Sequence, residues 1–329
     1  MNNQQAILFA GAKSVNELYN DTFCYNIKEK TWNKLNPTGQ IPSARAAHAA
    51  CAVENNNLLV FGGAKKNGGY SSNELYRLNI SNEPSWSILT CKDVKPSRRY
   101  GHTLIYSKPI IILFGGIVKD NNKLTNEIWT LNVEGLLQTS DGKNDLDKNI
   151  TENKYYVWRL LNFEIGRSIP RPRIYHTCGI CKMGKAKGMI TVFGGRDEKG
   201  HAMNDLWGLR KHRNGEWEWV MAPYDKSTIP LRRYQHSSIF YANFMILLGG
   251  RGDLNEDYFS NGMPVEIFNT QSLQWFYYSN YDRFRHSSFC VEKFGYSQGG
   301  CSYAKPSEPS DTMEMFDVQE LCYNTRYIT

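Results

Sequence analysis

Val60-Phe61-Gly62-Gly63 is the stretch that decides the fold, because close variants of it recur along the whole chain. Each copy is a short apolar strand that ends in two small residues. The final glycines fall at positions 11, 63, 116, 195, 250 and 300, so successive copies stand 52, 53, 79, 55 and 50 residues apart. A motif repeated at intervals of about 50 residues predicts a chain built from similar structural units rather than from unrelated domains.

Three further elements follow each glycine pair in a fixed order. First comes a second strand that begins with Asn-Glu or Asn-Asp, at Asn73, Asn126 and Asn204. A tryptophan then follows in most repeats, at Trp32, Trp86, Trp158, Trp217 or Trp219, and Trp275. Arg-x-x-His opens the next repeat, with its arginine at Arg45, Arg99, Arg173, Arg233 and Arg283. Four strand-like segments in each repeat predict an all-β, six-bladed β-propeller with four antiparallel strands per blade.

The predicted propeller is a single domain that fills residues 1–329. Its blades lie near residues 6–36, 45–90, 99–162, 173–222, 233–278 and 283–329. The third blade is long because a polar insertion, residues 134–156, separates its last two strands, and this composition predicts a solvated loop. The first blade starts at its glycine strand, so either Tyr323 to Thr329 or a longer natural chain would supply its missing strand.

Charge and cysteine usage exclude several classes of protein. The 39 Lys and Arg against 32 Asp and Glu give a net charge of +7, which could attract acidic partners or simply keep the chain soluble. No Lys/Arg-rich arm or RNA-binding motif is present, so we expect no nucleic-acid partner. Cys178 and Cys181 form a lone Cys-x-x-Cys without a second pair, so we expect no metal site.

Apolar segments are too short for a membrane protein. The longest apolar run, Ile110 to Phe114, cannot span a bilayer, and the polar N-terminus does not read as a signal peptide. The eight scattered cysteines fit buried free thiols in a reducing compartment. These features predict an intracellular protein of the cytoplasm or nucleus that does not bind membranes.

The order of glycine pair, aromatic residues and Arg-x-x-His resembles the kelch family throughout the chain. A narrower likeness covers residues 209–219, Leu-Arg-Lys-His-Arg-Asn-Gly-Glu-Trp-Glu-Trp, with Ala222-Pro223 and the motif from Arg233 to His236 after it. This segment is similar to the kelch region of protein serine/threonine phosphatases that carry N-terminal kelch repeats, the plant brassinosteroid-signalling type. The start of the sixth repeat, Arg283 to Ser287, is similar as well.

The phosphatase resemblance implies a C-terminal metallophosphatase domain in the parent protein. Such a domain holds two divalent metal ions, of the manganese or iron type, with Gly-Asp-x-His-Gly, Gly-Asp-x-Val-Asp-Arg-Gly and Gly-Asn-His-Glu segments. None of these segments occurs in the 329 residues. We therefore expect no catalytic residue and no cofactor in this chain, which would dock substrate or regulator proteins. The alternative is a stand-alone kelch adaptor or scaffold of the ubiquitin-ligase-receptor or cytoskeletal type.

Strand direction predicts where a partner would bind. In an antiparallel blade the glycine pair, the Asn-Glu start and the Arg-x-x-His motif share one rim. We expect the five repeat arginines to bridge neighbouring blades, with a second, shared role in gripping acidic or phosphorylated segments left open. Loops vary more than repeats, so specificity is expected from rim residues in segments 64–72, 117–125, 196–203 and 251–262. The candidate partner-binding residues are Lys65, Lys66, Lys119, Arg196 and Arg251, with Tyr100 and Tyr234 for aromatic contact.

Overall fold

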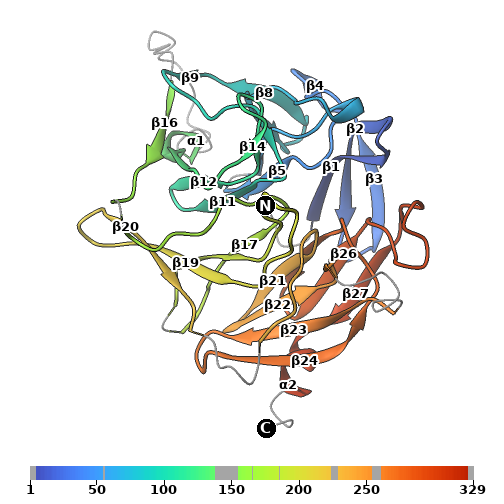
Figure 1. Ribbon diagram of the computed structural model, residues 1–329. Helices are drawn as coiled ribbons and strands as arrows, with labels where there is room; N and C mark the ends of the chain where they lie inside the picture. Colours follow the sequence, from blue (N-terminus) through green and yellow to red (C-terminus); the bar gives the residue numbers. More distant parts are fainter. Residues whose placement is uncertain are drawn as a thin grey trace. The chain divides into compact units, whose positions relative to one another are not determined.

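The computed structural model describes residues 5–54, 56–137, 155–164, 166–184, 186–223, 229–253 and 261–324. The chain forms two compact units, Met1–Leu161 and Asn162–Thr329, called unit 1 and unit 2 below. The regular secondary structure of the described ranges is nearly all β-strand, with two short α-helices (Figure 1). Neither helix is long and apolar enough to cross a membrane.

Unit 1 contains three large antiparallel sheets, one for each of its repeats. The first sheet consists of β1 (Gln5–Ser14), β2 (Glu17–Asn26) and β3 (Thr31–Leu35). The second consists of β5 (Ala49–Val53), β6 (Asn57–Phe61), β7 (Leu75–Asn79) and β8 (Ser85–Leu89). The third consists of β11 (Thr103–Ser107), β12 (Ile110–Phe114), β15 (Ile128–Asn132) and β16 (Tyr156–Leu161). Within each of these sheets the strands pair in the order given, each with the next one named.

Unit 2 contains three sheets of the same kind. The first consists of β17 (Thr177–Ile180), β18 (Ile190–Phe193), β19 (Leu206–Lys211) and β20 (Trp217–Met221). The second consists of β21 (Ser237–Tyr241), β22 (Phe244–Leu248), β23 (Met263–Asn269) and β24 (Gln274–Tyr281), which Figure 1 shows as one continuous sheet. The third consists of β25 (Ser287–Val291), β26 (Phe294–Gln298) and β27 (Met313–Asp317).

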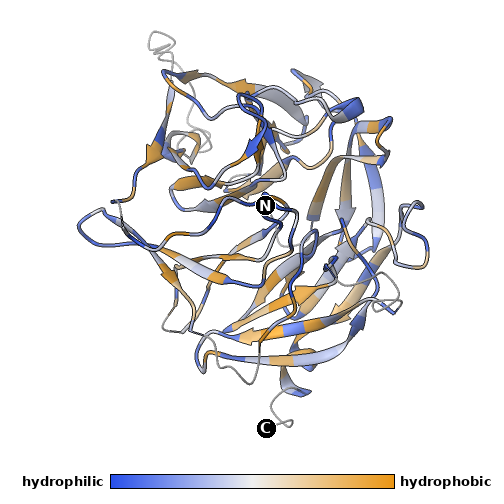
Figure 2. Ribbon diagram, viewed as in Figure 1, coloured by the Kyte–Doolittle hydropathy of each residue, from blue (hydrophilic) through white to orange (hydrophobic). Residues whose placement is uncertain are grey.

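In the five sheets after the first, the strand before the glycine pair is an inner strand. All five residues of β6 and of β22 are buried, so these strands are apolar on both faces instead of alternating. Figure 2 shows the contrast between the orange strand β22 and the blue hairpin that joins β19 to β20. Both faces of a blade are therefore covered, as packing between neighbouring sheets requires.

Aromatic side chains fill the space between neighbouring sheets. Phe61 at the end of β6 contacts Trp158 of the next repeat, with ring centroids 5.8 Å apart. Phe9 contacts Trp86 in the same way at 4.7 Å, and in unit 2 Phe193 contacts Trp275 at 5.4 Å. The repeat tryptophan thus packs on the phenylalanine of the preceding repeat, which ties adjacent sheets together.

Four of the six sheets, the second to the fifth, contain the predicted four antiparallel strands. In the second and third sheets the linkers add β4 (Thr38–Gly39) and β9 (Cys91–Lys92), which pair in parallel with β8 and β16. Each linker runs along the outer edge of the sheet that it leads into, where backbone groups are free to accept a further strand. The first and last sheets have three strands each in the described part of the chain.

The chain after β27 forms helix α2 (Val318–Asn324) rather than a fourth strand. Asp317 starts the helix, because its carboxylate accepts a hydrogen bond from the backbone N–H of Glu320 at 3.0 Å. Val318 and Cys322 are buried in the core beside Ile246. Tyr323 therefore belongs to a helix and not to the closing strand considered above; residues 325–329 lie outside the described residues.

The polar insertion also starts differently from the prediction. Glu134–Leu137 forms the short helix α1, whose first turn is capped by the side chain of Asn132 at 2.8 Å. Leu136 is buried in the core of unit 1, and so is Tyr156, where β16 begins. Both ends of the 134–156 segment are thus anchored by apolar contacts. Residues 138–154 lie outside the described residues.

Candidate interaction site

The arginine of each Arg-x-x-His motif is buried and bonded within its own repeat. Arg173 shows the full pattern: Nη1 donates to the carbonyl oxygen of Gly194 at 2.9 Å, and two nitrogens bond the Asp205 carboxylate at 2.9 and 2.7 Å. In each of the five repeats that have the motif, the arginine donates a hydrogen bond to the carbonyl oxygen of the first glycine of its own pair, at 2.9 to 3.2 Å. These pairs are Arg45 with Gly62, Arg99 with Gly115, Arg173 with Gly194, Arg233 with Gly249, and Arg283 with Gly299.

The predicted bridge between blades is made by the backbone of these arginines and not by their side chains. The carbonyl oxygen of Arg99 accepts a hydrogen bond at 2.8 Å from the N–H of Gly63 in the preceding repeat, and that of Arg283 accepts from Gly250 at 2.9 Å. The guanidinium groups bond their own repeats instead. The prediction of guanidinium bridging is corrected accordingly: the side chain closes one sheet at the rim while the peptide group holds the neighbour.

Burial removes these guanidinium groups from the candidate binding surface. Arg45, Arg99, Arg173 and Arg233 are 0% exposed, and Arg283 is 7% exposed. Arg233 forms an ion pair with Glu266, which is also 0% exposed, at 2.7 Å. Burial raises the pKa of Glu266, and the charge of Arg233 offsets part of this rise. A ligand could reach such groups only after the sheets had separated.

Asp205 shows the opposite balance. Burial alone would raise its pKa, but the hydrogen bonds and charge of Arg173, with a hydrogen bond from Trp207, outweigh burial and lower the pKa below 3.8. Its carboxylate is thus held ionised by the repeat motif. We assign it to the structure of the sheet rather than to the chemistry of a reaction.

The repeat histidines link neighbouring sheets. His236 Nε2 lies 2.9 Å from the hydroxyl oxygen of Thr177, and His286 Nε2 lies 2.7 Å from that of Ser237, each in the preceding repeat. Burial, followed by the charge of Arg283, lowers the pKa of His286 to about 3. The described residues bring no three His, Cys, Asp or Glu side chains together as metal ligands.

The glycine pair is required because two different repeats press against it. A Cβ atom added to Gly249 would lie 1.9 Å from the carbonyl oxygen of Arg283 in the next repeat. A Cβ atom added to Gly250 would lie 2.7 Å from the Cβ atom of His236 in its own repeat. The first glycine thus makes room for the neighbouring motif and the second for its own, which explains why both recur.

Basic and aromatic residues of unit 2, some exposed and some half-buried, gather next to this rim. The Arg196 guanidinium lies over the ring of Tyr234, 5.2 Å from its centroid, and that of Arg251 lies 4.9 Å from the centroid of Phe284. Tyr234 and Arg251 are joined by two backbone hydrogen bonds of 2.9 and 2.8 Å. The structure therefore brings three predicted residues together. The Arg285 guanidinium also lies near the Phe284 ring, 5.8 Å from its centroid. We call Arg196, Tyr234, Arg251 and Arg285 the arginine cluster.

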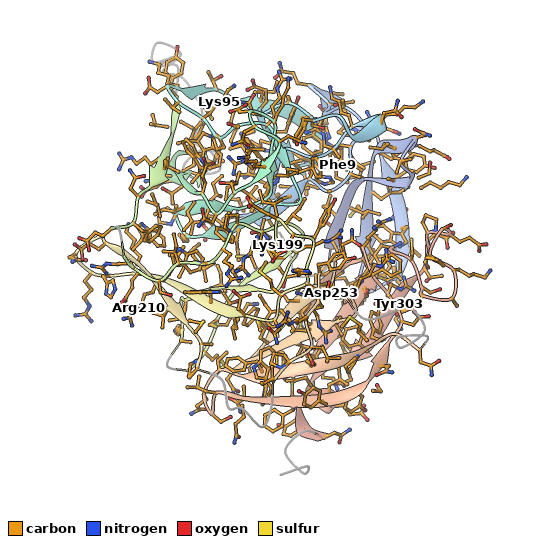
Figure 3. All side chains as sticks on the ribbon, viewed as in Figure 1. Phe9, Lys95, Lys199, Arg210, Asp253 and Tyr303 are labelled. Atoms are coloured by element: carbon orange, nitrogen blue, oxygen red, sulfur yellow. The ribbon has the colours of Figure 1, made fainter. Side chains whose placement is uncertain are left out.

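A second candidate surface is a polar depression in unit 1. It measures about 560 Å³ and is lined by Asn73, Lys95, Ser97, Arg98, Lys119 and Asp120; we call it the basic hollow. Lys119 extends from the small sheet formed by β10 (Arg99–Tyr100), β13 (Ile117–Val118) and β14 (Lys123–Leu124). Figure 3 labels Lys95 on the opposite segment, the linker that leads into Arg99.

The remaining predicted residues of unit 1 do not line the hollow. Tyr100 stacks at a tilt on Tyr70, with centroids 5.2 Å apart, and Tyr70 donates a hydrogen bond to Asn122 at 2.6 Å. Lys65 and Lys66 are exposed on a tight turn that precedes Tyr70. Of the four predictions in this unit, only Lys119 belongs to the hollow.

Sequence reasoning missed Lys95, Arg98 and Arg285. Arg98 directly precedes a repeat arginine, and Arg285 is the third residue of an Arg-x-x-His motif, so neither stands apart from the repeat in the sequence. The signal was present in the comparison of repeats: the third motif position holds Ala47, Gly101, Tyr175, Gln235 and Arg285 in turn. A position that varies among otherwise regular repeats marks a side chain that the fold does not require.

Two family models match the chain. The Attractin/LZTR1 beta-propeller model matches residues 81–327, and the KLHDC2/KLHL20/DRC7 Kelch-repeats domain model matches residues 1–143. The first match covers more than half of the chain and confirms the predicted propeller fold; the number of blades stays a prediction.

Individual relatives share the kelch region. The serine/threonine-protein phosphatase BSL2 of Arabidopsis thaliana is 29% identical over 260 residues, 78% of this chain and 22% of the phosphatase. Human host cell factor 2 is 30% identical over 74% of this chain and 29% of its own length. An F-box/kelch-repeat protein of Arabidopsis thaliana is 30% identical over 65% of this chain and 41% of its own. The chain thus spans less than half the length of these relatives.

Proposed function

Because this chain belongs to the kelch-repeat β-propellers, we propose that it is the non-catalytic docking module of a kelch-containing serine/threonine phosphatase. Its role is to bind substrate or regulator proteins for that enzyme. Kelch propellers generally mediate protein–protein interactions. The likeness to BSL2 supports the phosphatase as the parent protein, and it agrees with the resemblance of residues 209–219 to kelch phosphatases.

The observation that carries the docking role is the division of labour on the rim. Residues that recur in every repeat, such as Arg173 and His236, are buried and hold the sheets. Residues that differ among repeats form the exposed loops, and in unit 2 these present the arginine cluster. An arginine stacked on a tyrosine offers both charge and aromatic area with little loss of side-chain entropy, which is typical of residues that dominate interfaces.

The phosphatase chemistry would lie outside residues 1–329. The three metal-binding segments of a metallophosphatase do not occur in the sequence, so the two divalent ions would be held by another part of the parent protein. Purified alone, this chain is expected to release no phosphate from aryl phosphates with or without manganese.

A stand-alone adaptor is the second candidate function, favoured by the likeness to an F-box/kelch-repeat protein. Sequencing the coding region beyond residue 329 separates the two candidates. Metallophosphatase segments there support the phosphatase, and a stop codon or an unrelated domain supports the adaptor. The docking role of the rim is common to both.

Charge reversal in the arginine cluster tests docking. Arg196→Glu with Arg251→Glu is expected to abolish capture of the protein partners that the wild-type chain binds in cells, measured by quantitative proximity labelling. The melting temperature should stay within about 2 °C of wild type, because Arg196 is exposed, Arg251 is only half-buried, and substitutions in rim loops usually change stability little.

The matched control is Lys211→Glu with Arg213→Glu. Both residues are exposed on the hairpin formed by β19 and β20. The two substitutions change the net charge by the same amount as the reversal of Arg196 and Arg251. Figure 3 labels the neighbouring Arg210 on this outer hairpin, apart from Asp253 on a rim loop. If both double variants lose the same partners, docking depends on net charge alone and the arginine cluster is not the docking surface.

A further inference from the structure

The basic hollow of unit 1 has walls that are fixed by hydrogen bonds. The N–H of Lys119 donates to the carbonyl oxygen of Arg98 at 2.9 Å, which joins the rim hairpin to the linker. The Ser97 hydroxyl donates to the Asp120 carboxylate across the same junction. On the other wall the Asn73 amide donates to the carbonyl oxygen of Pro96 at 3.2 Å. The backbone that carries the lining side chains is therefore set before any ligand arrives.

Two of the four charges that line the hollow are already paired or bonded. Lys95 Nζ lies 2.7 Å from Glu74, and Asp120 accepts the hydrogen bond from Ser97. Glu74 occupies the position at which Glu127 and Asp205 bond their repeat arginines, but here Arg45 lies over the Tyr76 ring instead. The Glu74 carboxylate pairs with Lys95 and not with the repeat arginine.

The other two charges are cations without a counterion. Arg98 and Lys119 are exposed and form no ion pair with any residue in the described ranges. They extend from adjacent segments that share a backbone hydrogen bond, so their positive charges are held near each other. Like charges held close together repel, and an anion bound between them removes that repulsion.

We propose that the basic hollow binds the phosphate group of a phosphorylated segment in a partner protein. This inference rests on the proposed docking function and names the class of partner. Arg98 offers a planar fork of donors for phosphate oxygens, and Lys119 offers a mobile point charge. Part of the Asn73 amide is also available as a donor, since its second N–H is not used in the bond to Pro96.

The lining favours a phosphate over a carboxylate or an apolar side chain. All six lining residues are polar or charged, so the hollow provides little contact area for an apolar ligand. A phosphate near neutral pH carries close to two negative charges on three oxygens, which matches two unpaired cations better than the single charge of Glu or Asp. The negative charge of Asp120 weakens the binding of any anion through repulsion, and removing the charge of Asp120 measures this effect.

Binding of phosphopeptides to the isolated chain tests the proposal. The probes are a fluorescent peptide library with fixed phosphoserine and the same library with glutamate at that position, measured by anisotropy. We expect the phosphoserine library to bind and inorganic phosphate to compete. Arg98→Ala with Lys119→Ala should weaken binding at least about tenfold, because hydrogen bonds to charged groups contribute roughly that much each. Asp120→Asn should tighten binding about two- to fivefold.

Lys123→Ala is the matched control. Lys123 lies four residues from Lys119 on the same hairpin and is exposed, but it does not line the hollow. This variant should bind the phosphoserine library like the wild type. Lys119→Ala alone provides a second measurement with a smaller change, and melting curves verify that each variant is folded. Equal binding of the two libraries, unchanged binding by the double variant, or weaker binding by Asp120→Asn would overturn the proposal.

Failure here is distinguishable from failure of the docking function. The assay uses peptides and the isolated chain, whereas the docking test uses cellular partners and the arginine cluster of unit 2. Loss of cellular partners on reversal of Arg196 and Arg251, together with no preference for phosphoserine, would leave docking in place and remove only the hollow. If the isolated chain prefers phosphoserine and the reversal of Arg196 and Arg251 loses no cellular partner, the hollow remains as a binding site and the arginine cluster is not the docking surface.

Discussion

At the scale of single residues, neighbouring arginines in one linker have opposite roles. Arg98 is exposed and lines the basic hollow, whereas Arg99 is 0% exposed and bonds Gly115 and Glu127 at 3.2 and 2.7 Å. Arg98 lies in a bend just before β10, where its side chain stays in solvent, whereas Arg99 begins β10 and its side chain enters the interior of the repeat.

Alanine substitution of this pair separates structure from recognition. Arg99→Ala should lower the free energy of unfolding by roughly 1–3 kcal/mol, since the Gly115 carbonyl loses its side-chain donor and the packing of a buried side chain is lost. Arg98→Ala should change it by less than about 0.5 kcal/mol, as expected for an exposed residue. Urea unfolding of both variants measures the two values. Similar stability of the two variants would contradict a structural role for Arg99.

At the scale of elements, consecutive Arg-x-x-His motifs are joined through their third residue. The N–H of Gly101 donates to the carbonyl oxygen of Ala47 at 2.8 Å, and in unit 2 Arg285 donates to Gln235 and Gln235 to Tyr175 at 2.9 and 3.0 Å. All five third residues have a positive φ, between 50° and 65°. A left-handed backbone conformation turns the chain so that each motif can bond the next.

Glycine at this position should relieve the strain. Ala47→Gly is expected to raise the free energy of unfolding by about 0.5–1 kcal/mol, because the Ala47 φ of 50° costs alanine more than glycine loses in entropy. Ala50→Gly, three residues later in the extended strand β5, should instead lower it by a similar amount. Opposite signs in chemical denaturation support the explanation, and two losses would refute it.

The repeat pattern predicted the strands but not every bond between them. Spacing placed Phe61, Trp158 and the glycine pairs correctly, because these positions depend on what each sheet must bury. It did not distinguish whether the Arg173 side chain bonds its own sheet or the next, since both partners recur at the same interval. Linkers such as Thr38–Gly39 carry no alternating pattern, so their pairing in parallel with β8 could not be read from the sequence.

The candidate site was predicted only in part for a related reason. Arg196, Tyr234 and Arg251 were found because they lie in loops directly beside recognisable motifs. Lys95 and Arg98 were missed because the hollow forms where a linker meets a hairpin of the following repeat, and that meeting depends on the tertiary fold. The role of Glu74 was equally hidden, since only the structure shows that Arg45 leaves it free for Lys95.

At the scale of the molecule, buried histidines shared between sheets make stability depend on pH. The pKa of His286 is lowered to about 3 by burial and then by the charge of Arg283, and the pKa of His236 is lowered well below 6.5, mainly by burial. Between these values and 6.5 the unfolded chain binds protons that the folded chain does not. Stability is therefore complete above about pH 6.5 and falls as the pH falls. The raised pKa of Glu266 acts in the opposite direction, so a difference between variants is the clearer measurement.

His286→Gln isolates one of these groups. Each buried histidine is expected to remove about 2 kcal/mol from the free energy of unfolding between pH 7 and pH 5, because one pKa unit corresponds to about 1.4 kcal/mol. The glutamine variant will be less stable at both pH values, but its loss between them should be smaller than that of the wild type by about 2 kcal/mol. His201→Gln, at a side chain that is 61% exposed, should lose as much as the wild type. If His286→Gln shows the full wild-type loss in urea unfolding, the imidazole that contacts Ser237 is not what couples the assembly of the sheets to pH.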